Sequence, residues 1–323
     1  MITAAMEREL GSASPEQEVG RSSLTSRDRP GGRRDSGPIP LRSPLRRTLP
    51  MCRHHNGRMG WASWGNRRRR RHLRHPRENV FLGICVAVTV LAVVGAVNRS
   101  LGGDSGQPLL LLSVPGAVFF ARGILYARQR SDGVRISENQ FPEAHRMVVD
   151  AARELGLPRV PDAYVVLGNG RINAFASGHG FRRYVAITSD LFEVGGRLRD
   201  PDTLRFVIGH EVGHIAAGHA SYWRQFGVSV ANVIPGIGMT LNRAQEYTAD
   251  NHAYAFCPEG VEGLRILAAG KYLYRHVDFA DIADRAATDQ GFFVMLANLL
   301  SSHPVNTWRF HALSDRSRPG RVL

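Results

Sequence analysis

The pattern of apolar and polar positions divides the chain into a polar N-terminal part, an apolar part and a mixed part from about Ser131. Residues 80–97 carry no charge, and eighteen helical residues measure roughly 27 Å, enough to cross the hydrocarbon core of a bilayer. A second apolar stretch, residues 108–127, contains Arg122 near its end, where a long side chain can reach the membrane surface. We therefore predict two transmembrane helices joined by the glycine-rich segment 98–107.

The distribution of arginine predicts the side of the membrane. Arginine is frequent before the first apolar stretch and recurs directly after the second one, at Arg128 and Arg130, whereas the connecting segment holds only Arg99. Because positively charged flanks stay in the cytoplasm, this pattern places both chain ends there, and with them the C-terminal part. If the second stretch instead lies along the membrane surface, the orientation reverses and the C-terminal part lies outside.

Residues 1–79 have the composition of a disordered basic tail. They are rich in Ser, Pro and Gly, and their 18 arginines against 7 acidic residues supply most of the formal net charge of +14. Such a tail attracts nucleic acid weakly and without sequence preference. The run of arginines at 67–71 directly precedes the apolar stretch, which favours a cytoplasmic flank, so we expect no specific nucleic-acid partner. The three cysteines show no pairing pattern, which argues against a disulfide framework.

Residues 131–323 have the pattern of a soluble α+β domain. Helical periodicity over residues 138–157 predicts a first helix. Three short β-branched or aromatic runs, residues 163–167, 173–177 and 184–188, are separated by glycine-rich turns and predict a small antiparallel sheet.

A longer helix should follow this sheet. Asp200 and Pro201 are a helix-start signal, and the helix should continue towards Gly218. The stretch 226–241 is too short and too broken by proline and glycine to span a membrane, so we predict a loop or a short helical hairpin at the membrane surface. After Asn242 the pattern is mostly helical.

Two histidines and a glutamate in the longer helix have the spacing of a zinc site. His210 and His214 lie four residues apart, so both imidazoles project from one face and can bind one zinc ion. Glu211 beside them can accept a proton from a zinc-bound water that attacks a peptide carbonyl. A surface helix that carries these residues by chance is the alternative. The flanking residues are apolar, however, and buried imidazole and carboxylate groups need a partner that offsets their desolvation.

A catalytic zinc needs a third protein ligand, and the better candidates lie downstream. His219 lies about 140° further round the helix than His214, so we expect it to serve the structure or a hydrogen bond. Glu246 and Asp250 are again four residues apart in a helix-compatible stretch. One of them can bind zinc while the other accepts a hydrogen bond from a ligand imidazole. A solvated acidic face is the alternative for this pair.

The order and spacing of these residues resemble the HtpX and CAAX-prenyl-protease superfamily of membrane-associated zinc endopeptidases. The resemblance covers roughly residues 138 to 313 and rests on four elements in order: Asn173-Ala174-Phe175-Ala176, His210-Glu211-Val212-Gly213-His214, Glu246 with Asp250, and His303-Pro304 with Arg309. It implies a zincin-like, mainly helical catalytic domain with a small antiparallel sheet, preceded by the transmembrane hairpin.

The resemblance also implies a role for each residue near the metal. His210, His214 and Glu246 would bind one zinc ion per chain. Glu211 would be the general base, and Asp250 would support a ligand imidazole from outside the coordination sphere.

The remaining matched residues would handle the substrate. His303 would stabilise the oxyanion, Arg309 would brace the site, and Asn173 would lie on an edge strand that aligns an extended polypeptide. The expected function is therefore a membrane-anchored zinc endopeptidase, with HtpX-like proteolysis of membrane or misfolded proteins as the closer analogy. The alternatives are a zinc-free scaffold that recruits partners through the basic tail, although no ligand or base is missing, and a zinc hydrolase of a non-peptide substrate.

Overall fold

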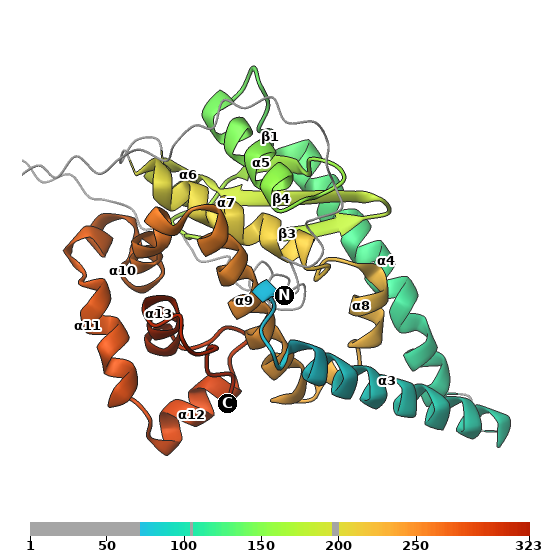
Figure 1. Cartoon of the computed structure of the whole chain (residues 1–323). Helices are drawn as coiled ribbons and strands as arrows, with labels where there is room; N and C mark the ends of the chain where they lie inside the picture. The colour runs from blue at the N-terminus through green and yellow to red at the C-terminus, as the bar shows by residue number, and fades with distance from the viewer. Residues whose placement is uncertain (1–71, 104–105, 196–199) are drawn as a thin grey trace, which may run out of the picture. The chain divides into compact units, whose positions relative to one another are not determined.

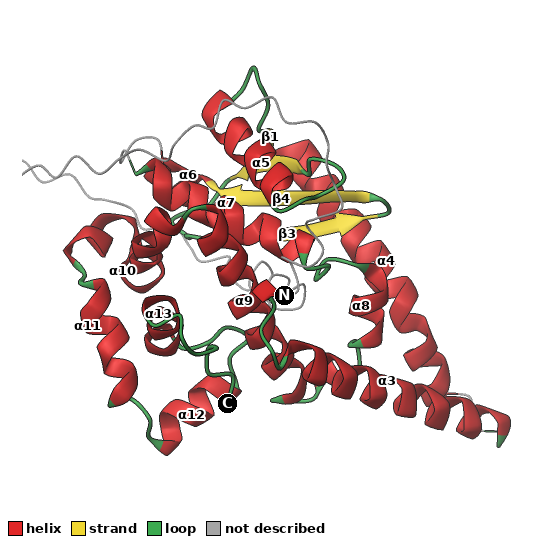
Figure 2. Cartoon of the chain, viewed as in Figure 1, coloured by secondary structure: helices red, strands yellow, loops and turns green. Residues whose placement is uncertain are grey.

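A computed structural model describes residues 72–103, 106–195 and 200–323, and most of them are helical (Figures 1 and 2). The predicted tail up to residue 71 lies outside the described residues. The strands are β1 (Val134–Arg135), β2 (Asp162–Val166), β3 (Ala174–His179) and β4 (Arg182–Thr188). The α-helices are α3 (Glu78–Leu101), α4 (Gly106–Asp132), α5 (Pro142–Glu154), α6 (Ser189–Gly195), α7 (Pro201–Ala216), α8 (Tyr222–Gly227), α9 (Ile237–Phe256), α10 (Arg265–Leu273), α11 (Phe279–Asp284), α12 (Phe292–Leu299) and α13 (Asn306–Ser314). Short 3-10 segments are η1 (Ala231–Val233), η2 (Pro258–Leu264), η3 (Tyr274–His276) and η4 (Arg285–Ala287).

The sheet is mixed, so the prediction of an antiparallel sheet is wrong. The strand order is β1-β2-β4-β3, with β2 and β4 parallel and the other two pairs antiparallel. The chain passes from β2 to the outer edge as β3 and returns as β4 between the two, which makes β4 parallel to β2. The apolar run from Tyr184 to Ile187 is fully buried, as expected for a strand with neighbours on both sides and cover on both faces.

Helices α7 and α9 carry the predicted metal-binding motifs and pack closely against each other. The Asp200 carboxylate accepts a hydrogen bond from Thr203 N at 3.1 Å, so the predicted helix start is confirmed. Glycines on α7 allow the close approach: a Cβ at Gly209 would lie 2.7 Å from Phe256 Cδ1, and one at Gly213 would lie 2.7 Å from His252 Cβ. The stretch 226–241, predicted as a loop or a short helical hairpin, contains η1, and α9 begins inside it.

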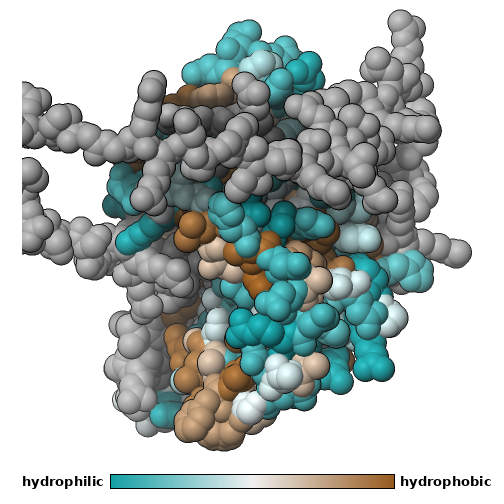
Figure 3. Space-filling model, turned by 90° about the vertical axis from the view of Figure 1, so that its left-hand side faces the viewer, coloured by the Kyte–Doolittle hydropathy of each residue, from teal (hydrophilic) through white to brown (hydrophobic). Residues whose placement is uncertain are grey.

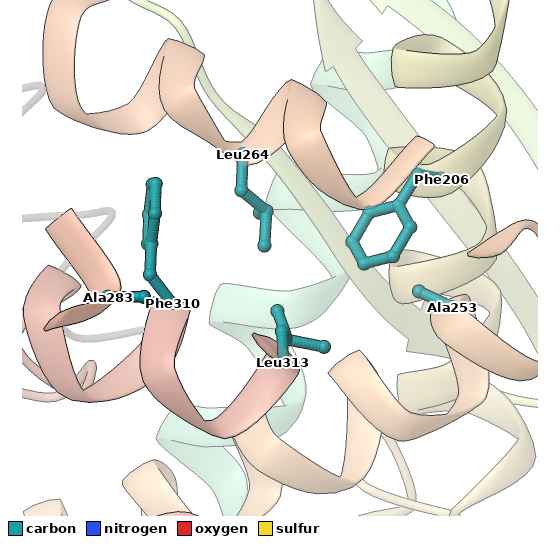
Figure 4. Close-up of a cluster of buried hydrophobic side chains, with 6 residues drawn as sticks. All are labelled: Phe206, Ala253, Leu264, Ala283, Phe310 and Leu313. Atoms are coloured by element: carbon teal, nitrogen blue, oxygen red, sulfur yellow. The ribbon is translucent and has the colours of Figure 1, made fainter. Parts of the chain in front are cut away.

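An apolar cluster fixes α13 against these two helices. Figure 4 shows its buried members converging from α7, α9, η2, α11 and α13, and they are Phe206, Ala253, Leu264, Ala283, Phe310 and Leu313. Because α13 also carries Arg309, the packing of this cluster determines where that guanidinium lies relative to α9.

Helix α3 alone among the described helices is long and apolar enough to cross a membrane. Its apolar side chains are largely exposed, for example Leu91, which is 71% exposed. Helix α4 contains Pro115 and lacks a sufficiently apolar stretch of the length that a membrane span needs. The predicted transmembrane hairpin is therefore supported for its first helix only.

Arg122 on α4 does not reach towards a membrane surface, contrary to the expectation for a snorkelling side chain. Its side chain is buried, and it donates from Nε to Gly178 O at 2.6 Å and from Nη2 to Ala220 O at 2.7 Å. Phe119, one turn earlier, contacts the His179 ring, with ring centroids 4.8 Å apart. The C-terminal half of α4 therefore packs on the edge strand β3.

The segment that precedes α3 is folded against α9, although the sequence analysis assigned residues up to 79 to the tail. His75 is buried, donates its backbone N–H to Thr248 Oγ1 at 2.9 Å and stacks on the Tyr247 ring. Asn251 Nδ2 donates to Leu73 O at 2.9 Å. Residues 72–79 thus belong to the folded domain.

Helix α12 exposes apolar side chains at its N-terminal end, whereas its C-terminal end is held by hydrogen bonds from a buried side chain. Phe292 and Phe293 are exposed, and apolar side chains gather at the lower end of the face in Figure 3, at the height where α12 lies in Figure 1. At the other end, the buried Arg243 on α9 donates to Asn298 O at 2.6 Å and to Ser301 O at 2.7 Å. These bonds position the chain that leads to His303.

Candidate metal centre

The two histidines of α7 and the glutamate of α9 meet at one point. His210, His214 and Glu246 are all buried. The Nε2 atoms of the two imidazoles lie 3.2 Å apart. Each of them also lies 3.4 Å from a carboxylate oxygen of Glu246. His210 and His214 lie on one face of α7 because they are four residues apart. The close contact between α7 and α9 at the glycines then brings Glu246 next to them.

This donor set fits a zinc ion. Tetrahedral zinc with bonds of about 2.0–2.1 Å requires neighbouring donor atoms about 3.3 Å apart. The two imidazole nitrogens lie 3.2 Å apart, and each lies 3.4 Å from a different oxygen of Glu246, so the separations are close to this value. Two imidazole nitrogens and a carboxylate are also the ligand types that zinc accepts in a catalytic site.

Asp250 and Arg309 fix the orientation of the His210 ring. His210 Nδ1 lies 2.9 Å from Asp250 Oδ1, and Arg309 donates to both oxygens of this carboxylate, from Nε and Nη2, at 2.7 Å each. Burial opposes ionisation of Asp250, but the Arg309 guanidinium and the bond with His210 outweigh it and lower the Asp250 pKa to about 2. An ionised Asp250 accepts the Nδ1 hydrogen of His210, which leaves Nε2 with its lone pair directed at the metal position.

Glu211 lies on α7 directly after the candidate ligand His210. The residue is buried, and its Oε2 has no hydrogen-bond partner among the described residues. Burial raises the pKa of this carboxyl group, although the neighbouring His210 and His214 counteract the rise. A buried carboxylate of this kind is available to a water molecule or a substrate group rather than to the fold.

His303 lies at the rim of the centre. It lies in the segment before α13, its side chain is 47% exposed, and its Nε2 is 3.7 Å from Glu246 Oε2. Its neighbour Ser302 contributes an Oγ 3.0 Å from Nδ1. The structure therefore brings His303 close to the predicted ligands while leaving one side of the ring open to solvent.

Asn173 lies directly before the edge strand β3, with its backbone turned inwards. It donates its N–H to Thr188 Oγ1 and accepts from Thr188 N, both at 3.0 Å. Because bonded and non-bonded pairs alternate along an antiparallel ladder, Ala174, Ala176 and Gly178 turn their backbone groups to the open edge. Arg122 already donates a hydrogen bond to Gly178 O. The backbone N–H and C=O groups of Ala174 and Ala176 are therefore the ones with which an added strand could pair.

Sequence reasoning missed a carboxylate behind the second histidine. His219, expected to serve the structure or a hydrogen bond, places its Nδ1 2.8 Å from His214 Nδ1. Its Nε2 lies 3.2 Å from Oε1 of Glu78, a residue from the predicted tail. Nothing in the sequence distinguishes Glu78 from an ordinary charged residue that flanks an apolar helix.

Comparisons with known proteins agree with this site. The chain matches the sequence profile of peptidase family M48 over residues 138–225 and 220–317, which include α7, α9 and α13. It is 26% identical over 288 residues to a protein named protease HtpX homolog from Ralstonia pickettii, covering 74% of this chain and 96% of the relative. Proteins of the same name from Ralstonia nicotianae (26% over 287 residues, 73% and 96% covered) and Burkholderia lata (24% over 288 residues, 74% and 96%) are also similar. No solved structure matches the chain.

Proposed function

The chain belongs to peptidase family M48, and from this membership we propose that it is a membrane-associated, zinc-dependent endopeptidase with its centre between α7 and α9. The observation that carries the proposal is the buried triad His210, His214 and Glu246, whose candidate ligand atoms lie close enough together to bind one metal ion. The buried carboxylate of Glu211 lies beside it, with one oxygen that has no hydrogen-bond partner in the described part of the chain. Family membership supports a peptidase, and the ligand types of the triad support zinc as its metal.

The roles of the residues follow from their positions. His210, His214 and Glu246 would hold the ion, with His210 oriented by Asp250. Zinc bound there would polarise the scissile carbonyl and lower the pKa of a water molecule. Glu211 would take the proton from the attacking water and transfer it to the leaving amine, which is the work of a general base and then a general acid.

The substrate would enter along the edge of β3. Ala174 and Ala176 present free backbone groups, so an extended polypeptide can pair with them as an added strand, with the Asn173 side chain at the start of this edge. His303, half-exposed beside Glu246, would donate a hydrogen bond to the negative charge that develops on the carbonyl oxygen. An open strand edge favours a peptide over a small non-peptide substrate.

The positions at which the two apolar helices meet the domain support a membrane orientation. The first residue of α3, Glu78, and the C-terminal half of α4 both contact the catalytic part, at Thr248 and Gly178 respectively. If α3 crosses the bilayer and α4 returns, the catalytic part lies on the side of both ends. Arginines on this side favour the cytoplasm, and the similar proteins named HtpX homologs make membrane or misfolded polypeptides the proposed substrates.

Replacement of the proposed base tests this function. We expect Glu211→Gln to bind zinc as tightly as the wild type but to cleave an unfolded protein in detergent at least about 100-fold more slowly. The matched control is Glu143→Gln, an exposed residue on α5, which should keep full activity. Unchanged cleavage by Glu211→Gln would exclude this residue as the base, and a pure wild-type protein that binds no zinc would exclude the metal-dependent mechanism.

A further inference from the structure

A buried carboxylate from the first turn of α3 lies behind the candidate metal centre. Glu78 is 0% exposed, and its Oε1 accepts hydrogen bonds from Arg74 Nη1 at 2.8 Å and from Arg224. Its Oε2 accepts from the Thr248 hydroxyl, and Arg74 also donates to Ala217 O just after α7. Because a buried carboxylate with two guanidinium partners has little freedom to move, Glu78 is a fixed point shared by α3, α8 and α9.

His219 connects this carboxylate with the imidazole of His214. Its ring is 4% exposed and lies between the two groups. One nitrogen, Nδ1, is 2.8 Å from His214 Nδ1, and the other, Nε2, is 3.2 Å from Glu78 Oε1. Both nitrogens of the ring therefore have a partner, and the contacts form a continuous path from α3 to α7.

The direction of each hydrogen bond follows from the chemistry of the imidazoles. A His214 ring that presents its Nε2 lone pair to a metal carries its hydrogen on Nδ1 and donates it to Nδ1 of His219. The neutral His219 ring then carries its own hydrogen on Nε2 and donates it to Glu78. His210 is held in the same way but directly, by Asp250 at 2.9 Å. Each candidate histidine ligand is thus connected to a buried carboxylate, His210 directly to Asp250 and His214 through His219 to Glu78.

We propose that His219 and Glu78 are positioning residues that hold the His214 ring for zinc binding, so that the metal centre is complete only when the first turn of α3 is docked. This inference rests on the proposed zinc site. It gives the apolar helix a second role besides membrane attachment, because loosening its first turn would release the ligand imidazole. Partners of this kind usually contribute about 10–100-fold to metal affinity.

We call the hydrogen-bonded path from Glu78 through His219 to His214 the relay. The zinc affinity of the full-length protein in detergent, measured by competition with a chromogenic chelator, tests it. We expect Glu78→Gln and His219→Leu to weaken zinc binding at least about 10-fold. His219→Asn, which keeps an acceptor near the position of Nδ1, should bind zinc more tightly than His219→Leu. The control Asp190→Asn changes another buried carboxylate, which accepts from Lys271 Nζ at 2.6 Å outside the site, and should keep the wild-type affinity.

Each outcome decides the question. Folded Glu78→Gln and His219→Leu proteins that bind zinc as tightly as the wild type would overturn the relay alone. An equal loss of affinity in Asp190→Asn would show general loosening and would also overturn it. If Glu78→Gln does not fold because Arg224 has lost its counter-charge, equal zinc affinity of His219→Leu and His219→Asn overturns the relay. A wild-type protein without zinc would instead overturn the proposed function together with the relay.

Discussion

Asp250 shows most clearly, at the scale of the residue, how the site depends on groups that do not touch the metal. Its carboxylate joins His210 on one helix to Arg309 on another, and all three side chains are buried. The contact with Asp250 keeps a hydrogen on Nδ1 of His210 and so reserves Nε2 for the proposed metal. Removing this carboxylate should also destabilise the fold, because the Arg309 guanidinium would then be buried without its counter-charge.

Replacement of this carboxylate should therefore damage both stability and metal binding. We expect Asp250→Asn to lower the free energy of unfolding by about 3–5 kcal/mol and zinc affinity by about 10–100-fold. Chemical denaturation and chelator competition measure the two effects. Asp150→Asn, which loses partly exposed pairs with Arg205 and Arg153, should cost less than about 1 kcal/mol, and an equally small effect at Asp250 would contradict the assignment.

Some residues of the centre could be predicted from their spacing in the sequence, and others only from the family resemblance. The four-residue spacings of His210 with His214 and of Glu246 with Asp250 follow from helix periodicity, and the structure brings both pairs together. His303 was found only through the family resemblance. Its proximity depends on a turn held by buried backbone contacts, and no local pattern in the sequence encodes such contacts.

At the scale of the element, the contact between α7 and α9 determines the distance between the metal-binding motifs. An alanine usually favours a helix over glycine by about 1 kcal/mol. At Gly213, however, the added Cβ would lie 2.7 Å from His252 Cβ and 3.3 Å from Ala249 O, and would push α7 away from α9. We expect Gly213→Ala to destabilise the fold by about 1–3 kcal/mol and to weaken zinc binding.

A glycine without neighbours provides the matched control. In α3 a Cβ at Gly95 would meet nothing within 4 Å, so Gly95→Ala should leave both stability and zinc binding unchanged or slightly improved. Thermal unfolding in detergent and zinc titration of the two variants provide the comparison. Equal behaviour of Gly95→Ala and Gly213→Ala would mean that the α7–α9 distance does not control the centre.

The edge of β3 depends on a side chain from a different element. Arg122→Ala would leave the carbonyls of Gly178 and Ala220 without their donor, and each buried unpaired group costs about 1–3 kcal/mol. We expect a fall of about 2–4 kcal/mol in the free energy of unfolding. The exposed Arg128→Ala should stay within about 0.5 kcal/mol, and similar values for both would remove Arg122 from the packing of β3.

Sequence periodicity predicted the three longer strands but not their order. Runs 163–167, 173–177 and 184–188 correspond closely to β2, β3 and β4. An antiparallel meander is the simplest connection for such short turns, whereas the actual order places β4 in the centre. In this order β4 has a neighbouring strand on each side and its residues from Tyr184 to Ile187 are buried, and the pattern of short runs does not encode which strand takes this place.

At the scale of the whole molecule, α3 joins the proposed membrane attachment to the candidate metal centre. The chain should remain with the membrane fraction after alkaline extraction, because α3 exposes its apolar side chains along most of its length. A reporter fused after Leu323 should be active in the cytoplasm if α3 and α4 form the proposed hairpin. A fusion that is active only outside the cytoplasm would refute this orientation and leave the metal centre unaffected.

The zinc content of the purified protein tests the central claim most directly. Metal analysis of the wild type in detergent should give close to one zinc ion per chain, and Glu246→Gln, which removes the third ligand, should retain less than roughly a tenth of that after dialysis against a weak chelator. Glu143→Gln should match the wild type. A Glu246→Gln protein that keeps its full zinc content would contradict the assignment of His210, His214 and Glu246 as the ligand set.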